Sequence, residues 1–118
     1  MAAPGAAALG LLHEGVRAAR DLGARPQLAA VLDWSLTVLV KIGRSEPAGM
    51  LVGALTHGAL ADVGNWPLSA GTRARTLDRV RAELGEDATD RLVAEGAAMT
   101  YDEIIEYALE HLGAAASS

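Results

Sequence analysis

Three histidines are the first residues of this sequence whose side chains could do chemistry. Imidazole groups can bind a metal ion or transfer a proton near neutral pH. His13, His57 and His111 are, however, too far apart in the sequence to form a local metal-binding motif. His111 falls in the last turn of an expected helix, where a positive charge is favoured. We therefore interpret all three as histidines on helix surfaces or in partly packed positions.

Four carboxylates near the end of the chain could form a metal or substrate cluster: Asp102, Glu103, Glu106 and Glu110. Glu103 is instead expected in a capping box with Thr100, since the two residues are three positions apart. Glu106 and Glu110 are four positions apart and so share the polar face of a helix. We favour a solvated helix face for this acidic group, and the sequence has no EF-hand loop.

No nucleophile or phosphate-binding loop is evident elsewhere in the sequence. Ser35 lies on an apolar helix with no His or Asp at a motif spacing. Cysteine is absent, which excludes disulfides, thiolate catalysis and cysteine-based metal sites. The Gly-x-x-x-x-Gly-Lys-Ser/Thr pattern of an ATP-binding loop is also missing. The sequence therefore predicts a protein that is not an enzyme and needs no cofactor.

Arginines and tryptophans are the candidates for an interaction surface. Arg73, Arg75, Arg79 and Arg81 would form one basic strip on a helix. The strip could bind phosphate, but we favour pairing with the acidic helices that follow it or with a partner, because the chain is acidic overall.

The two tryptophans have alternative interpretations. Trp34 and Trp66 are expected as core and cap anchors. Trp66 follows a turn and precedes Pro67, so it could instead be exposed as a binding hot spot. The candidate interaction residues are accordingly Trp34, Trp66, Arg73, Arg75 and Arg79.

Capped amphipathic helices must position these side chains. The spacing of apolar residues predicts an all-α fold of about six helices in antiparallel hairpins. We expect one helical domain over residues 1–113 and a flexible tail over 114–118. The expected helices cover 6–22, 26–42, 46–63 and 70–84, then a short helix capped by Asp87, and a last helix from Thr100 to a stop at Gly113.

Glycines and apolar residues add detail to these helices. Gly23 and Gly43 are expected stops, and Ser45 is the expected cap of the third helix. The helix over 26–42 is apolar nearly all round and is expected to be the central one. Glycines within the helix over 46–63 would let a neighbouring helix approach closely: Gly49, Gly53 and Gly58. The hairpin over 6–42 has about the size of one tetratricopeptide repeat, so a fragment of such a superhelix is predicted.

Composition restricts the setting of the protein. The chain has 118 residues and a formal net charge of −5, which argues against direct nucleic-acid binding. No apolar run reaches the ~20 residues of a membrane span. The N-terminal segment lacks the basic start of a signal peptide. A cytoplasmic protein is therefore expected.

The order of motifs in the second half resembles a known family. Residues 46–55 (EPAGMLVGAL), the turn at 66–69 (WPLS), 77–86 (LDRVRAELGE), 92–96 (LVAEG) and 99–109 (MTYDEIIEYAL) follow one another. This order is similar to the C-terminal, tetratricopeptide-like helical region of large bacterial LuxR/AfsR/MalT-like signal-transducing ATPase regulators, some of which carry adenylate-cyclase-like domains. Thr89 and Val93 stand where that family usually has Phe and Trp.

The resemblance covers about residues 6–112 and implies a function in transcriptional regulation. It implies a non-catalytic interaction or regulatory module, either an excised fragment of such a regulator or a small stand-alone relative. The partner would be another protein or the remainder of the regulator, recognised in a groove between the second, third and fourth expected helices. An exposed apolar strip could also drive homodimerisation. The alternative is a domain that senses a small inducer near Trp34, Trp66 and the glycine-rich third helix.

Overall fold

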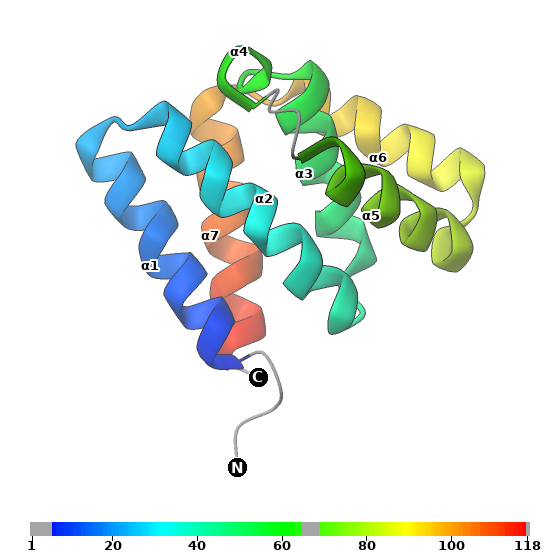
Figure 1. The fold of residues 1–118 in the computed structure, drawn as a ribbon, viewed down its shortest axis with the longest axis horizontal. Helices are drawn as coiled ribbons and strands as arrows, with labels where there is room; N and C mark the ends of the chain where they lie inside the picture. Colours follow the sequence, from blue (N-terminus) through cyan, green and yellow to red (C-terminus); the bar gives the residue numbers. More distant parts are fainter. Residues whose placement is uncertain (1–5, 65–68, 118) are drawn as a thin grey trace.

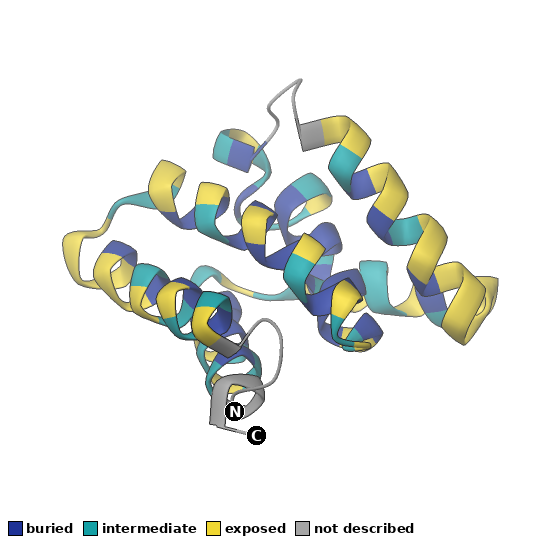
Figure 2. Ribbon diagram, turned by 60° about the horizontal axis from the view of Figure 1, so that its bottom comes forward, coloured by how far each residue is buried: buried dark blue, intermediate teal, exposed yellow. Residues whose placement is uncertain are grey.

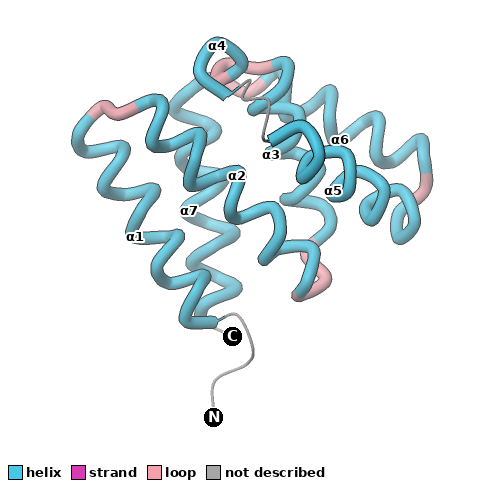
Figure 3. Tube along the Cα trace, viewed as in Figure 1, coloured by secondary structure: helices cyan, strands magenta, loops and turns pink. Residues whose placement is uncertain are grey.

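The described residues of the computed structural model, 6–64 and 69–117, form seven helices and no strand. The helices are α1 (Ala6–Leu22), α2 (Arg25–Lys41), α3 (Ser45–His57), α4 (Ala61–Gly64), α5 (Ser69–Leu84), α6 (Glu86–Ala98) and α7 (Tyr101–Ser117). Short connections join most of them (Figure 3). The all-α fold expected from the sequence is confirmed, whereas the tetratricopeptide-like superhelix stays a prediction.

The helices are arranged in two layers. α1, α2 and α5 lie side by side in one layer, and α7, α3 and α6 lie behind them (Figure 1). The short helix α4 packs on α2 and α3 at one end. Exposed residues occupy the outer faces of the helices and buried residues face the neighbouring helices (Figure 2). The front layer therefore presents one broad surface made by α1, α2 and α5.

Left-handed glycines end the first two helices. Gly23 and Gly43 have φ values of 65° and 81°, a conformation that costs other residues more than it costs glycine. The Ala24 N–H donates to the Ala19 carbonyl at 2.9 Å, and the Arg44 N–H donates to the Leu39 carbonyl at 2.8 Å. These bonds satisfy carbonyls at the helix ends, as in a Schellman motif. The two predicted stops are confirmed.

The core between the layers is aliphatic. Among the described residues it comprises 20 buried Leu, Val, Ile and Ala residues, contributed by α1, α2, α3, α5, α7 and the turn before α4. The largest fully buried side chains include Leu9, Leu28, Leu36, Leu51 and Ile104. Burial of such side chains contributes about 1.5–3 kcal/mol each, so the stripes read from the sequence are what hold the layers together.

The central helix is α3, and the prediction that the helix over 26–42 is central is wrong. α3 packs against α2, α4, α5, α6 and α7, whereas α2 packs against α1, α3, α4 and α5. One face of α2 remains in solvent, with Trp34, Thr37 and Lys41 exposed. Small residues explain the difference, because they let α3 be enclosed on more sides than the larger side chains of α2 allow.

Close packing of α3 on α6 depends on glycines of both helices. A Cβ atom on Gly53 would overlap the Val93 carbonyl oxygen and lie 2.8 Å from its carbonyl carbon. A Cβ on Gly96 would overlap the Met50 carbonyl oxygen and lie 2.7 Å from its carbonyl carbon. The prediction that glycines of this segment allow a close approach is confirmed. Gly96 is the reciprocal contribution of α6.

Two predicted helix limits are wrong. The helix over 46–63 ends at His57, because Gly58 is extended (φ −105°, ψ −152°) and the chain turns before α4. The last helix does not stop at Gly113 but continues to Ser117. A Cβ on Gly113 would lie 3.2 Å from the His13 ring, so this glycine makes room for α1 instead of ending α7.

Two predicted N-caps are also wrong. Ser45 is the first residue of α3, and its hydroxyl donates to the Glu83 carboxylate on α5. Gly85 is the N-cap of α6 and makes no side-chain capping bond, while Asp87 lies in the first turn. A carboxylate there still interacts favourably with the helix dipole. Of the turn expected at residues 66–69, only Ser69 lies within the described residues.

The capping box at the start of α7 is confirmed and gives a direct test of local stability. The Thr100 hydroxyl accepts from the Glu103 N–H at 3.2 Å, and the Glu103 carboxylate accepts from the Thr100 N–H at 2.9 Å. We expect Thr100→Ala to lower the free energy of unfolding by about 1 kcal/mol, measured by urea denaturation. Thr100→Ser keeps the hydroxyl and should change it little. Equal losses in both variants would show that the hydroxyl does not stabilise α7.

Candidate interaction surface

The outer face of the front layer carries an apolar groove between α1 and α2. Ala8, Leu11, Leu12 and Gly15 line it from α1, and Val31, Trp34 and Val38 line it from α2. The groove has a volume of about 390 Å³. Trp34 and Leu11 are each 72% exposed. An indole and an isobutyl group that remain in water beside a groove are typical of a surface that another molecule covers.

A second groove lies on the other side of α2, against α5. Lys41, Arg75 and Arg79 supply its positive charges, together with Thr37 and Val40 of α2 and Thr72 and Thr76 of α5. Its volume is about 210 Å³. The three cationic side chains are exposed, and no carboxylate of the described residues forms an ion pair with them. This groove is a positively charged site on an acidic protein.

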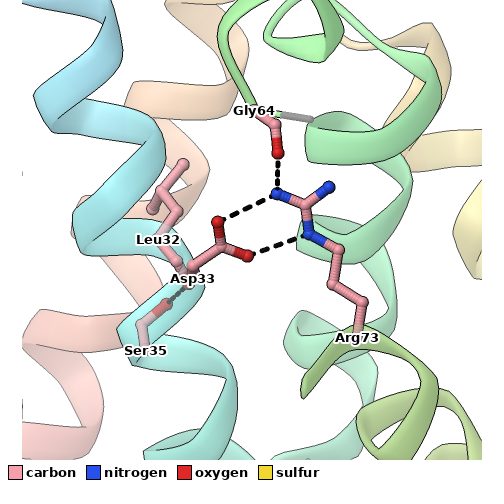
Figure 4. A network of polar contacts seen from close by, with 5 residues as sticks. All are labelled: Leu32, Asp33, Ser35, Gly64 and Arg73. Carbon is pink, nitrogen blue, oxygen red and sulfur yellow. Dashed lines mark hydrogen bonds and ion pairs between the residues drawn. The ribbon is translucent and has the colours of Figure 1, made fainter. Parts of the chain in front are cut away.

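Arg73 does not belong to the exposed basic strip. It is 7% exposed, and its Nε and one terminal nitrogen each donate to an Asp33 carboxylate oxygen of α2 at 2.9 Å. The same terminal nitrogen also donates to the Gly64 carbonyl at the end of α4 (Figure 4). The prediction of Arg73 as an interaction residue is wrong, because the arginine joins α2, α4 and α5 inside the fold.

The other candidates are dispersed. Arg75 and Arg79 are exposed as predicted, and Arg81 pairs with Asp78 of its own helix at 3.6 Å. The strip was expected to pair with the acidic helices that follow it. Arg73 instead pairs with Asp33 of α2, and Arg81 pairs with Asp78 of α5. Trp34 is exposed, and its interpretation as a core anchor is wrong. Trp66 lies outside the described residues.

The histidines and carboxylates considered for chemistry do not converge. His57 is exposed, and His13 and His111 are half-buried on different helices. Asp102, Glu103 and Glu106 are exposed on α7, as is Glu110. Within residues 6–64 and 69–117, no group of three His, Asp or Glu side chains could hold a metal ion.

A third groove contains a perturbed tyrosine. Glu46, Leu84, Arg91, Glu95, Tyr107 and His111 are among its lining residues, and the rings of Tyr107 and His111 lie 4.2 Å apart. Burial, and then the nearby carboxylates of Glu46, Glu110 and Glu95, raise the pKa of Tyr107. Like an ordinary tyrosine, the phenol is protonated at neutral pH, and the raised pKa extends that neutral form to more alkaline pH.

Sequence reasoning missed Leu11 and Lys41. Lys41 is seven residues after Trp34, and seven residues make about two helical turns, so both lie on one face of α2. Leu11 falls beside the apolar stripe of its helix and not on it. That offset was a readable signal of an exposed apolar residue. The sequence could not predict that Lys41 lines the basic groove, because the groove forms only where α5 packs beside α2.

Within the described residues the protein is all-α. Its front layer carries an apolar groove on one side of α2 and a basic groove on the other. Comparisons with models of protein families, with curated proteins and with solved structures found no match to the chain. No described helix has both the length and the apolar character needed to cross a membrane.

Proposed function

We propose that this chain is a non-catalytic helical module that binds a protein partner in the cytoplasm. The single observation that carries the proposal is the exposure of Trp34 and Leu11 beside an apolar groove. Tryptophans near the centre of an interface often contribute much of the binding energy. A rigid helical layer also presents its groove without first having to order a loop, which lowers the entropic cost of binding.

We further propose that the module is related to the helical region of bacterial LuxR/AfsR/MalT-like ATPase regulators. The support is the order of motifs in the sequence and a helical fold along the stretch that carries them. The partner would then be the remainder of such a regulator or a separate protein. A second copy of the chain is a further candidate, since the apolar groove could be self-complementary.

The inducer-sensing alternative receives no support from the described residues. Its expected pocket combined the tryptophans with the glycine-rich third helix. The glycines of α3 are instead covered by Leu92 and Val93 of α6. Trp34 faces α1 and solvent, on the opposite layer. We therefore favour protein binding.

Site-specific photo-crosslinking in cells of the source organism tests the proposal. A benzoylphenylalanine in place of Trp34 should form a covalent adduct with one defined protein, because this position lies in the proposed interface. The same residue in place of Ala94, which is exposed on α6, is the matched control and should form none. Mass spectrometry identifies the adduct.

Each crosslinking result has a distinct meaning. An ATPase regulator in the adduct supports the family relationship, and a second copy of the chain identifies a homodimer. Absence of adducts from position 34, or the same adducts from positions 34 and 94, would contradict an interface at Trp34.

A further inference from the structure

The apolar and basic grooves are two sides of one surface, because both are built on the exposed face of α2. Val31, Trp34 and Val38 line the apolar groove, and Thr37, Val40 and Lys41 line the basic groove. Trp34 and Lys41 are separated by about two helical turns, so they follow one another along the same ridge. α1 and α5 flank this ridge on either side, and both pack against α2.

The basic side has a charge that its surroundings do not neutralise. The whole chain carries a net charge of −5, yet Lys41, Arg75 and Arg79 converge on one groove with no carboxylate paired to any of them among the described residues. Arg73, on the same helix, shows the contrast, since Asp33 neutralises it. Three like charges held together without a counter-charge are complementary to an anionic partner group.

We propose that this composite surface binds an acidic amphipathic helix of a protein partner, which deepens the proposed function and rests on it. The apolar face of that helix would lie in the groove beside Trp34 and Leu11. Its carboxylates would contact Lys41, Arg75 and Arg79 across the ridge of α2. This is a helix-in-groove mode of recognition with a charged flank.

Charge excludes two other occupants. A nucleic acid would leave the apolar half uncovered, and its row of phosphates needs more basic side chains than the three of this groove. Anionic lipid surfaces are usually bound by clusters of about 4–8 basic residues, and this groove has three. A protein helix that carries both apolar and acidic residues matches both halves of the surface.

Fluorescence anisotropy with labelled peptides provides the test. The probe is a designed amphipathic helix of about 18 residues with leucines on one face and glutamates along one flank. A matched peptide has lysine in place of every glutamate, and a third has the same composition in scrambled order. We expect the acidic peptide to bind at least about tenfold more tightly than either control. Raising the salt from about 0.05 M to about 0.5 M should weaken its binding.

Variants of the protein assign the two halves separately. Trp34→Ala should weaken binding of the acidic peptide by at least about tenfold. Arg75→Glu with Arg79→Glu should do the same and should remove the preference for acidic over basic peptide. Arg91→Glu, a single charge reversal on α6 away from both grooves, is the control and should change nothing. All four side chains are exposed, so unchanged melting temperatures should accompany these results.

The outcomes separate this inference from the function that it extends. If all leucine-bearing helical peptides bind equally and still require Trp34, the surface binds protein but the acidic partner is wrong. If no peptide binds and Trp34 produces no crosslink in cells, both proposals fail. Stronger binding to phosphatidylserine vesicles than to the acidic peptide would overturn the inference. A dimer that Trp34→Ala dissociates, with no peptide bound, would likewise overturn it.

Discussion

Replacing Arg73 with leucine should lower the free energy of unfolding by about 3–5 kcal/mol. The substitution leaves the Asp33 carboxylate buried without its positively charged partner, and removes the donor to the Gly64 carbonyl. Both side chains of the pair are about 10% exposed or less, so water cannot replace the lost bonds. Since whole domains are stable by only about 5–15 kcal/mol, urea denaturation followed by circular dichroism would detect this loss easily.

Two further variants show whether the cause is the loss of the arginine charge beside Asp33. The double variant Arg73→Leu with Asp33→Leu removes both charges and should recover much of the loss, because buried ion pairs are often replaceable by apolar groups. Arg75→Leu, two residues further along α5 and exposed, should change stability by no more than about 0.5 kcal/mol. A double variant as unstable as Arg73→Leu alone would show that the pair stabilises through packing.

Replacing Gly96 with alanine should also destabilise the fold, by about 1–3 kcal/mol. Alanine is the better helix former by up to about 1 kcal/mol, so the isolated helix would gain. In the fold, however, the added methyl group would overlap the Met50 carbonyl oxygen. Backbone atoms of α3 cannot rotate away as a side chain can, so α3 and α6 must separate and lose contacts. Denaturation curves again measure the change.

Gly10 is the matched control for this substitution. It lies inside α1, and a Cβ atom there would have no atom of the described residues within 4 Å beyond its chain neighbours and the backbone of its own helix. Gly10→Ala should therefore stabilise the protein by up to about 1 kcal/mol. Opposite signs at the two positions would confirm that helix packing decides the effect. A stabilised Gly96→Ala variant would contradict the close approach of α3 and α6.

The peptide and crosslinking experiments address function, while these two substitutions address the frame that holds the surface. The Asp33–Arg73 pair joins α2 to α5, and these are the helices that form the basic groove. Loss of that pair should disturb Lys41 and Arg79 relative to one another. Stability measurements should therefore precede any binding measurement on variants near this pair.

The sequence by itself determined the helical class, most helix starts and the two glycine stops, because these depend on local rules. A 3.6-residue apolar period, a capping box at Thr100 and left-handed glycines act within one or two turns of helix. The close-packing role of Gly53 was also readable, since a glycine that weakens a helix needs a reason in its packing.

Only the tertiary structure decided which helix is central, which arginine is buried and that Trp34 is exposed. Arg73 and Arg75 are the same residue type on the same helix, two positions apart. Arg73 is buried because Asp33 of the neighbouring helix α2 binds it, whereas Arg75 is exposed. The sequence predicted Trp34 as a core residue. In the fold, α1 and α5 pack on either side of α2, and the outer face of α2, which carries Trp34, is exposed to water. The contact between Asp33 and Arg73 joins residues 40 positions apart, and no local pattern specifies it.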